Sequence, residues 1–149
     1  MYGHMRAQLR PLLIAVMPAL LVAGLSSCSG SPSASVASTP APAQGLELVD
    51  ASIASQVIND LAPVVIDVRT PAEYAEGHID GAALIDVSAA DFVQQIDALD
   101  RGATYFVYCR SGNRSATATS AMVQMGFTSL FELDGGVIAW SAAGLPLVR

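Results

Sequence analysis

From residue 45 onwards, short apolar runs of strand length alternate with segments whose apolar residues recur at helical spacing. The run Val64 to Val68 is rich in β-branched residues and lies between a proline and a charge, which is typical of a parallel strand buried on both faces. The other runs expected to form strands are Leu46 to Val49, which we place at a sheet edge, Ala82 to Val87, Tyr105 to Tyr108 and Ser129 to Leu133. Strands that alternate with helices predict an α/β fold with a mostly parallel sheet.

Helix signals mark the segments between these runs. Asp50 is placed to cap the first helix, and Thr70 to Glu73 combines a capping threonine, a proline at the first helical position and a glutamate three residues after the cap. A short helix around Trp140 closes the domain. The apolar residues that follow helical spacing are Ile53, Ala54, Val57, Ile58 and Leu61 after Asp50, then Phe92, Ile96 and Leu99 in the segment Asp91 to Leu99, and Ala118, Ala121, Met122 and Met125 before Gly126.

Residues 1–27 have the pattern of a secretory signal peptide, with Arg6 and Arg10 but no acid ahead of the apolar run Leu12 to Leu25. That run of about 15 residues is shorter than the roughly 20 that a transmembrane helix needs, so we do not predict one. It ends in Leu-Ser-Ser-Cys, which resembles a bacterial lipoprotein box, and the resemblance implies that Cys28 is lipidated as the first residue of the mature protein. The alternative is an ordinary signal peptide that is cut further on, with an incidental cysteine.

The segment Ser29 to Gln44 carries no charge and is dominated by serine, proline and alanine, so it predicts a disordered tether within residues 28–44. The folded domain is then expected to span residues 45–149, a length that suits one compact core. A lipid on Cys28 would anchor the exported protein to the outer face of a bacterial membrane, on the periplasmic or cell-envelope side, with no other membrane contact.

The expected domain is strongly acidic. All thirteen acids of the chain lie in it against five arginines, which gives a net charge of about −8, and the chain contains no lysine. Such a surface argues against nucleic acid as a partner. An anionic substrate would be repelled at long range and attracted only close to Arg110 and Arg114.

The candidate chemistry lies in Cys109 and the residues that follow it, Arg-Ser-Gly-Asn-Arg-Ser. A thiolate is the reactive form of cysteine, and an unperturbed thiol is only a few per cent ionised at neutral pH. Arg110, Arg114, the backbone N–H groups of the loop and a helix starting near Ser115 would all favour negative charge at Cys109. They would also hold an anionic substrate there.

The alternative is that Cys109 is a buried core residue, because free cysteine is among the most buried residue types and the preceding run is apolar. Two arginines and a glycine directly after the thiol favour a reactive site instead. If Cys28 is lipidated, Cys109 is the only thiol of the mature protein, which leaves no internal disulfide and no second cysteine to resolve an intermediate.

Several motifs occur together and in order: Asp67 to Tyr74, Gly77 to Ala82, Cys109 to Ser115, Asp134 to Gly136 with Trp140, and Gly144 to Pro146. Together they resemble the rhodanese (sulfurtransferase) family in its single-domain form. The resemblance implies one rhodanese-like domain, with a mostly parallel five-stranded sheet and helices on both faces.

The resemblance also implies an enzyme of the thiosulfate sulfurtransferase type. Cys109 would take sulfane sulfur from a small donor such as thiosulfate, form a persulfide, and pass the sulfur to cyanide or to an external thiol, which could belong to a protein. The substrate-binding residues would be those of the loop: Arg110, Ser111, Gly112, Asn113, Arg114 and Ser115. No metal or cofactor is expected. His78, Asp67, Arg69 and Glu73 match positions that we interpret as structural.

Two other functional classes remain open at this point. One is a persulfide carrier or a partner-binding module with a rhodanese-like fold. The other is a phosphatase or arsenate reductase, whose loops place five residues between the cysteine and the arginine. Here four residues separate Cys109 from Arg114, which favours a smaller pocket suited to sulfur.

Overall fold

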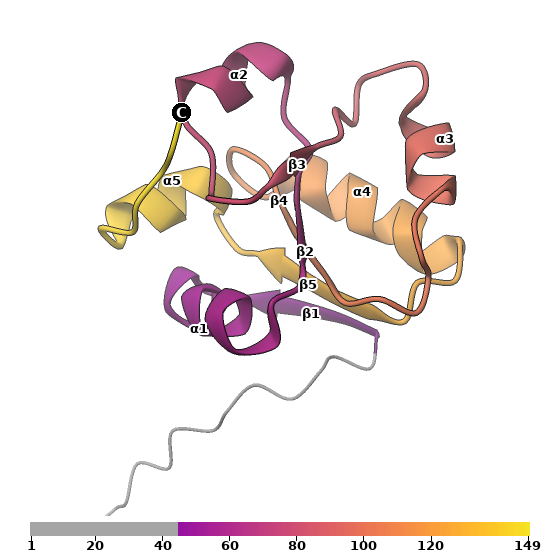
Figure 1. Cartoon of the computed structure of the whole chain (residues 1–149), viewed down its shortest axis with the longest axis horizontal. Helices are drawn as coiled ribbons and strands as arrows, with labels where there is room; N and C mark the ends of the chain where they lie inside the picture. The colour runs from indigo at the N-terminus through magenta and orange to yellow at the C-terminus, as the bar shows by residue number, and fades with distance from the viewer. Residues whose placement is uncertain (1–44) are drawn as a thin grey trace, which may run out of the picture. The chain divides into compact units, whose positions relative to one another are not determined.

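In the computed structural model, which describes residues 45–149, five parallel strands form one sheet in the order β1-β5-β4-β2-β3 (Figure 1). The predicted α/β fold with a parallel five-stranded sheet is therefore confirmed. The predicted signal peptide, the lipidated Cys28 and the tether lie outside the described residues. The strands are β1 (Gly45–Val49), β2 (Val64–Asp67), β3 (Ala83–Leu84), β4 (Tyr105–Tyr108) and β5 (Ser129–Leu133).

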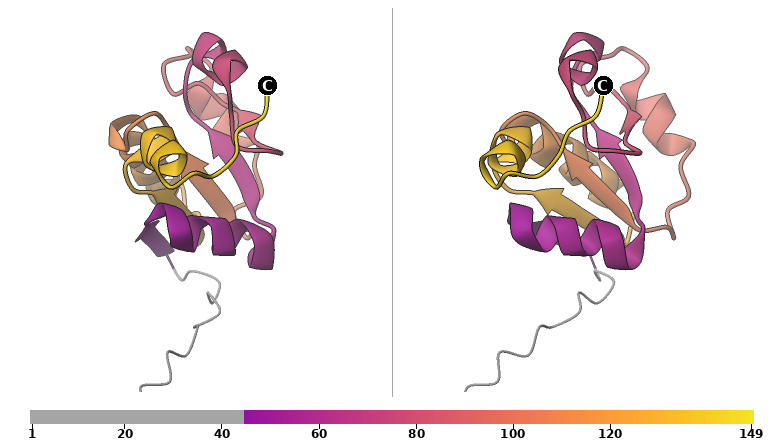
Figure 2. Two further views of the ribbon diagram at one scale, coloured as in Figure 1. Left: turned by 90° about the vertical axis from the view of Figure 1, so that its left-hand side faces the viewer. Right: turned by 60° about the vertical axis from the view of Figure 1, so that its left-hand side comes forward.

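Five helices connect or follow these strands, namely α1 (Ala51–Leu61), α2 (Pro71–Glu76), α3 (Phe92–Asp97), α4 (Asn113–Gln124) and α5 (Gly136–Ala142). They cover both faces of the sheet, as Figures 1 and 2 show. The central strand β4 is buried throughout, and its side chains alternate between two cores. Tyr105 and Val107 pack with residues of α3 and α4, whereas Phe106 and Tyr108 pack with residues of α1 and α5.

The expected strands and helices are present, with differences at their ends. The edge position of β1 is confirmed, and β2 lies between β4 and β3. Strand β3 has two residues in place of the predicted six, although two more backbone hydrogen bonds follow it, from Ile85 N–H to Asp67 and from Val87 N–H to Val68. A strand with one neighbour loses its regular ladder as soon as the chain turns away, which sequence periodicity does not reveal.

Helix α2 begins as predicted. Its capping box is complete, because Thr70 Oγ1 accepts from the Glu73 N–H at 3.4 Å while the Glu73 carboxylate accepts from the Thr70 N–H at 3.2 Å. Pro71 occupies the first helical position and the helix ends at Glu76. Just before it, Asp67 and Arg69 form a buried ion pair of 2.6 Å, and Arg69 also donates to the Gly77 carbonyl. These charged residues fix the path of the chain between β2 and α2.

The first turn of α5 holds the loop after β4. Val137 N–H donates to the carbonyl oxygen of Cys109 at 2.9 Å, and Ile138 N–H donates to that of Arg110 at 3.2 Å. Both donors belong to the first turn of α5, where N–H groups have no partner inside the helix. Gly136 allows this approach, since a Cβ at that position would stand 2.7 Å from the Arg110 carbonyl oxygen, and its φ of 58° is left-handed.

We predict that Gly136→Ala lowers the free energy of unfolding by roughly 2–4 kcal/mol, since it adds a steric overlap to the strain of a left-handed alanine. Chemical denaturation would measure the loss. Gly144→Ala is a matched control, because Gly144 has a φ of 74° but no atom within 4 Å of the added Cβ. It should cost only about 1 kcal/mol. Equal losses in the two variants would show that contact with the loop is unimportant.

Candidate active site

Cys109 lies directly after β4, at the carboxyl end of the central strand, where ligand sites of parallel sheets are found. Cys109 is only 1% exposed, so the thiol is buried, as the alternative of a core cysteine also required. The chain turns at Gly112, which has a φ of 99°, and α4 begins at Asn113, two residues earlier than the predicted start near Ser115. Cys109 is thus enclosed between the end of a strand and the first turn of a helix.

The loop directs hydrogen-bond donors at the sulfur. Gly112 N–H donates to Cys109 Sγ at 3.1 Å, and the Ser115 hydroxyl lies 3.5 Å from the same atom. Burial raises the pKa of Cys109, but hydrogen bonds from the Ser115 hydroxyl and from the backbone N–H groups of Ser115, Ser111 and Gly112 outweigh it. The pKa of the thiol therefore lies below its ordinary value, which favours the thiolate, the reactive form of cysteine.

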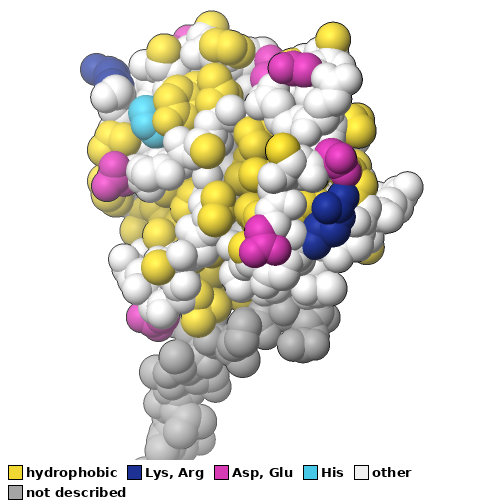
Figure 3. All heavy atoms as spheres, turned by 45° about the vertical axis from the view of Figure 1, so that its right-hand side comes forward, with side chains coloured by type: hydrophobic (Ala, Val, Ile, Leu, Met, Phe, Trp, Pro, Cys, Tyr) yellow, Lys and Arg dark blue, Asp and Glu magenta, His cyan; other side chains and the backbone are white. Residues whose placement is uncertain are grey.

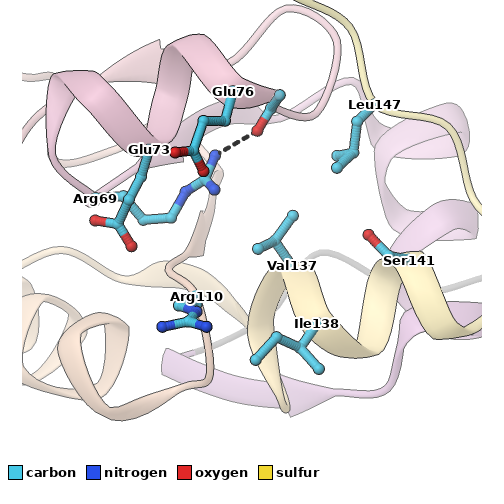
Figure 4. A pocket seen from close by; sticks show the side chains of 9 residues that line it. Arg69, Glu73, Glu76, Arg110, Val137, Ile138, Ser141 and Leu147 are labelled. Carbon is cyan, nitrogen blue, oxygen red and sulfur yellow. Dashed lines mark hydrogen bonds between the residues drawn. The ribbon is translucent and has the colours of Figure 1, made fainter.

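Arg110 lies next to Cys109 in the loop and has an exposed side chain. Within residues 45–149 it makes no ion pair. It borders a pocket of about 770 Å³ between α2 and α5, which Figure 4 shows from close by. The other residues that line the pocket are Arg69, Glu73, Glu76, Gly77, Val137, Ile138, Ser141 and Leu147.

Cys109 itself is not on the wall of this pocket. The next residue of the loop, Arg110, lines the pocket. Val137 and Ile138 form part of its apolar side. These two residues are the ones whose N–H groups hold the loop carbonyls. A molecule in the pocket would therefore lie against the outer side of the loop that surrounds the sulfur.

Arg114 is used differently from Arg110. Its two terminal nitrogens donate to the two carboxylate oxygens of Glu73, at 2.8 Å and 2.7 Å. Hydrogen bonds from Arg114 are the main reason why the pKa of Glu73 falls to about 2, and the same hydrogen bond raises the pKa of Arg114. This bidentate pair ties the start of α4 to α2, so the charge of Arg114 is largely balanced inside the protein.

The remaining predicted loop residues contribute through the backbone. Ser111 and Gly112 supply N–H groups, and no side-chain hydrogen bond of Ser111 is present. Asn113 is exposed at the first position of α4, and its carbonyl accepts from Thr117. The structure thus brings the loop around the sulfur, but among the described side chains only that of Ser115 forms a hydrogen bond with Sγ.

Two residues that the sequence interpretation missed lie behind the loop. The Glu132 carboxylate on β5 accepts from the Ser115 hydroxyl at 2.8 Å and from the Thr119 hydroxyl at 2.9 Å. Glu132 is 4% exposed and Thr119 is fully buried. A single acid inside the apolar run Ser129 to Leu133 was the one signal that could have identified this position.

Neither a histidine nor a metal group accompanies the thiol in this part of the chain. His78 stacks on Tyr74 with ring centroids 3.7 Å apart, and its Nδ1 lies 3.1 Å from the Tyr74 carbonyl oxygen, which suits a structural histidine. Among residues 45–149, no three His, Cys, Asp or Glu residues gather as metal ligands would. The helices of this same range are all too short or too polar to cross a bilayer.

The domain model described as a rhodanese-like domain matches residues 50–143. The chain belongs to the rhodanese family. A "Sulfurtransferase" of Allochromatium vinosum is 35% identical over 101 residues, which are 67% of this chain and 92% of that protein. "Thiosulfate sulfurtransferase GlpE" of Pseudomonas fluorescens is 39% identical over 87 residues, 58% of this chain and 77% of that protein.

Solved structures share the fold of this rhodanese domain. A rhodanese-related protein of Thermoplasma volcanium superposes with a TM-score of 0.59 at 29% identity, covering 68% of this chain and 97% of that one. A protein of Rhodopseudomonas palustris, described as a possible tyrosine phosphatase, gives a TM-score of 0.58 at 25% identity and covers 69% and 85%. The rhodanese chain is an enzyme of sulfurtransferase type, and its substrates are a sulfur donor and a sulfur acceptor.

We predict that Ser115→Ala raises the pKa of Cys109, because within residues 45–149 it removes the one side-chain hydroxyl that donates to Sγ. The rate of iodoacetamide alkylation at neutral pH should fall several-fold, since a hydrogen bond to a charged atom is worth about 1–3 kcal/mol. Ser111→Ala is the control, because Ser111 acts through its backbone N–H, which alanine keeps. Equal alkylation of wild type and Ser115→Ala would contradict the assignment.

Proposed function

We propose that this rhodanese domain transfers sulfane sulfur from thiosulfate by way of a persulfide on Cys109. The observation that carries the proposal is the environment of Sγ, where N–H and hydroxyl donors surround a buried sulfur and lower the pKa of its thiol. Such donors stabilise an anionic sulfur before and after it accepts a second sulfur atom. The relatives named thiosulfate sulfurtransferase support the choice of donor.

The reaction balances with groups that the site provides. The Cys109 thiolate attacks the outer sulfur of thiosulfate, the S–S bond of thiosulfate breaks, and sulfite leaves with that electron pair. Cyanide or a thiolate then attacks the outer sulfur of the persulfide. Thiocyanate or a new persulfide departs, and the Cys109 thiolate is restored. No general base acts within the cycle, because Cys109 returns as the thiolate.

Arg110 is the residue that we assign to binding of the donor. It is exposed beside the loop without an internal ion pair, and its guanidinium can hold the sulfonate oxygens while the sulfane end reaches Sγ. Arg114 is not assigned this role, because Glu73 already accepts from both of its terminal nitrogens. Its function in our proposal is to hold α2 against the start of α4.

The same ion pair bears on phosphatase and arsenate reductase activity. An oxyanion of that size needs a loop with more room and an arginine that is free to bind it. Here four residues separate Cys109 from Arg114, and the guanidinium is held by Glu73. Both features favour sulfur transfer over phosphoryl transfer.

The acceptor must come from outside the described domain, because Cys109 is its only cysteine. The pocket beside Arg110 is lined on one side by the apolar residues Val137, Ile138 and Leu147 and on the other by acidic side chains of α2. It is much larger than a cyanide ion and could hold a larger acceptor. Figure 3 shows one face of the domain, on which basic side chains are few and separated. We therefore propose an external thiol as the acceptor in the cell, carried by a small molecule or a protein, with cyanide as a substitute in the assay.

We predict that incubation with thiosulfate adds one sulfur atom to the protein and that cyanide removes it with release of thiocyanate. Intact-mass analysis would detect both steps. Cys109→Ser should stay unmodified, since an alcohol of normal pKa is not a nucleophile here. A wild-type protein that stays unmodified but hydrolyses an aryl phosphate would overturn the proposal. Loading with thiosulfate and slow turnover with cyanide would identify a persulfide carrier with a dedicated acceptor.

We also propose that the domain acts outside the cytoplasm, held to a membrane through a lipid on Cys28. The support is the sequence pattern alone, a basic start and a short apolar run that ends in Leu-Ser-Ser-Cys. The uncharged segment up to Gln44 would then act as a spacer between the lipid and the domain.

For this anchor we expect that Cys28→Ala removes the mature-length protein from the membrane fraction, because the acyl chains supply the attachment. The variant should then appear either as a soluble protein or as a longer, uncleaved precursor. Cell fractionation with immunoblotting would detect the change. Cys109→Ser, which alters the other cysteine, should remain in the membrane fraction. If Cys28→Ala stays with the membrane as a mature-length protein, the lipid assignment is wrong.

A further inference from the structure

The buried carboxylate of Glu132 has no role in the mechanism proposed above, although it lies one hydroxyl away from the nucleophile. Ser115 Oγ is 2.8 Å from Glu132 Oε1 and 3.5 Å from Cys109 Sγ. Glu132 projects from β5 toward α4, the helix that carries Ser115 and Thr119. The serine hydroxyl therefore stands between a carboxylate and a sulfur, both of which accept hydrogen bonds.

Glu132 differs from the other buried acid of the domain. Asp67 accepts from the Arg69 guanidinium and from a backbone N–H, so its charge is matched by a cation. Within residues 45–149, Glu132 has no ion-pair partner and accepts only from two hydroxyl groups. A buried carboxylate that depends on hydroxyl donors is sensitive to where each hydroxyl hydrogen points.

Each of those hydroxyl groups has one hydrogen and several acceptors. Ser115 can donate to Glu132, to the Gly112 carbonyl at 2.8 Å, or to Sγ. Thr119 can donate to Glu132 or to the carbonyls of Ser115 and Ala116, at 3.0 Å and 3.3 Å. One hydrogen cannot satisfy all of these acceptors fully, so Glu132 and Cys109 compete for the hydroxyl of Ser115.

We propose that Glu132 is a positioning residue of the sulfurtransferase site, which draws the Ser115 hydroxyl away from Cys109 Sγ and so restrains the thiolate. This inference rests on the proposed role of Cys109 as the sulfur carrier. With Cys109 as a thiol, its S–H donates to Ser115 Oγ while the serine hydroxyl donates to Glu132. With Cys109 as a thiolate, its proton has left to solvent and the serine hydroxyl turns to the sulfur.

The second arrangement takes a donor from Glu132 and leaves it with Thr119 alone. When the thiolate forms, Glu132 therefore loses the hydrogen bond from Ser115, and this loss costs free energy. A neutral residue in the same place would not impose that cost. The same restraint applies to the persulfide anion, which also gains from a hydroxyl donor. Glu132 would thus hold the sulfur less reactive than the loop alone would make it.

Few other charges face this group. From α4 comes Arg114, which is paired with Glu73 of α2, and β4 contributes Tyr105 on the same face of the sheet, whereas Tyr108 packs on the other face. From β1 comes Glu47, which is exposed and in register with Phe131 rather than with Glu132. Asp60 is exposed on α1, which covers the opposite face of the sheet, and the loop adds Arg110 next to the sulfur.

The test is the pH dependence of Cys109 alkylation by iodoacetamide in Glu132→Gln. Glutamine keeps the shape of the side chain but removes its charge, and its amide can donate to Ser115 Oγ instead of taking its hydrogen. We expect the midpoint of the alkylation profile to move to lower pH, with a several-fold faster reaction below the wild-type midpoint. A midpoint that is unchanged or higher would overturn the proposal.

Glu47→Gln is the matched control, since it removes the same charge from the neighbouring strand without contact to Ser115. It should leave the profile in place. A double variant separates hydrogen bonding from charge. If Glu132→Gln acts through Ser115, its shift should largely disappear in a Ser115→Ala background. A shift of full size in that background would show that Glu132 acts by charge alone and would refute the positioning role.

Thr119→Val offers a second route if Glu132→Gln does not fold. Valine has nearly the shape of threonine but removes the other hydroxyl donor of Glu132, so the carboxylate would hold Ser115 more strongly. The alkylation midpoint should then move to higher pH, opposite to the effect of Glu132→Gln. A midpoint at or below the wild-type position would contradict the proposal.

Alkylation reports the thiol and not sulfur transfer, so the two proposals can fail separately. If the midpoints move as expected but thiosulfate adds no sulfur, Glu132 controls the thiol and the proposed donor is wrong. If thiosulfate loads Cys109 in all variants while the midpoints stay together, sulfur transfer stands and the role of Glu132 is wrong.

Discussion

The site depends on the direction of a few peptide groups. The carbonyls of Cys109 and Arg110 point outward, where they accept from the first N–H groups of α5. With those carbonyls fixed, the following N–H groups are free to point inward at Sγ. Without these hydrogen bonds from α5, the peptide groups of the loop could rotate and turn a carbonyl oxygen toward the sulfur. An oxygen acceptor in that position would favour the thiol. The thiolate is therefore favoured by the Ser115 hydroxyl and by backbone N–H groups whose direction is fixed from outside, more than by neighbouring cations.

This arrangement divides the roles of the two arginines that the sequence places side by side. Arg110 faces the pocket between α2 and α5 and has its charge available. Arg114 is committed to Glu73, the residue that also completes the cap of α2. The domain surface carries many acids, so an anionic donor meets one accessible cation at the loop, next to the atom with which it reacts. The attraction between such a donor and the protein acts only at short range, close to Arg110. Added salt should therefore weaken this binding less than it would weaken binding that depends on long-range attraction.

Much of the fold could be predicted because its signals are local. Apolar runs of strand length, the Thr70 capping box and the proline after it determine elements within a few residues, and all of these are present. Cys109 could be identified as well, since a thiol followed by arginines and glycine is unusual at the end of a buried strand. Ile53, expected on the buried side of α1, is 36% exposed, because helical spacing does not reveal the width of the buried stripe.

The remainder of the site could not be predicted for a related reason. The partners of Arg114 and Ser115 are 41 and 17 residues away, and only the packing of α2 and β5 against α4 brings them together. From sequence, Arg114 was assigned to the substrate and Glu73 to a helix cap, and nothing local indicates that they bind each other. Glu132 was overlooked because a strand pattern treats one acid as an interruption, not as a group placed under an active-site loop.

The double use of Glu73 has a consequence for how this chain can change over evolution. One carboxylate accepts from Thr70 at the start of α2 and from Arg114 at the start of α4. Replacing Glu73 removes a partner from both Thr70 and Arg114, and replacing either of those two removes a partner from Glu73, so each substitution alters which residues are tolerated at the positions bonded to it. In a set of homologous sequences, we therefore expect these three positions to vary together, although more than forty residues separate the first from the last.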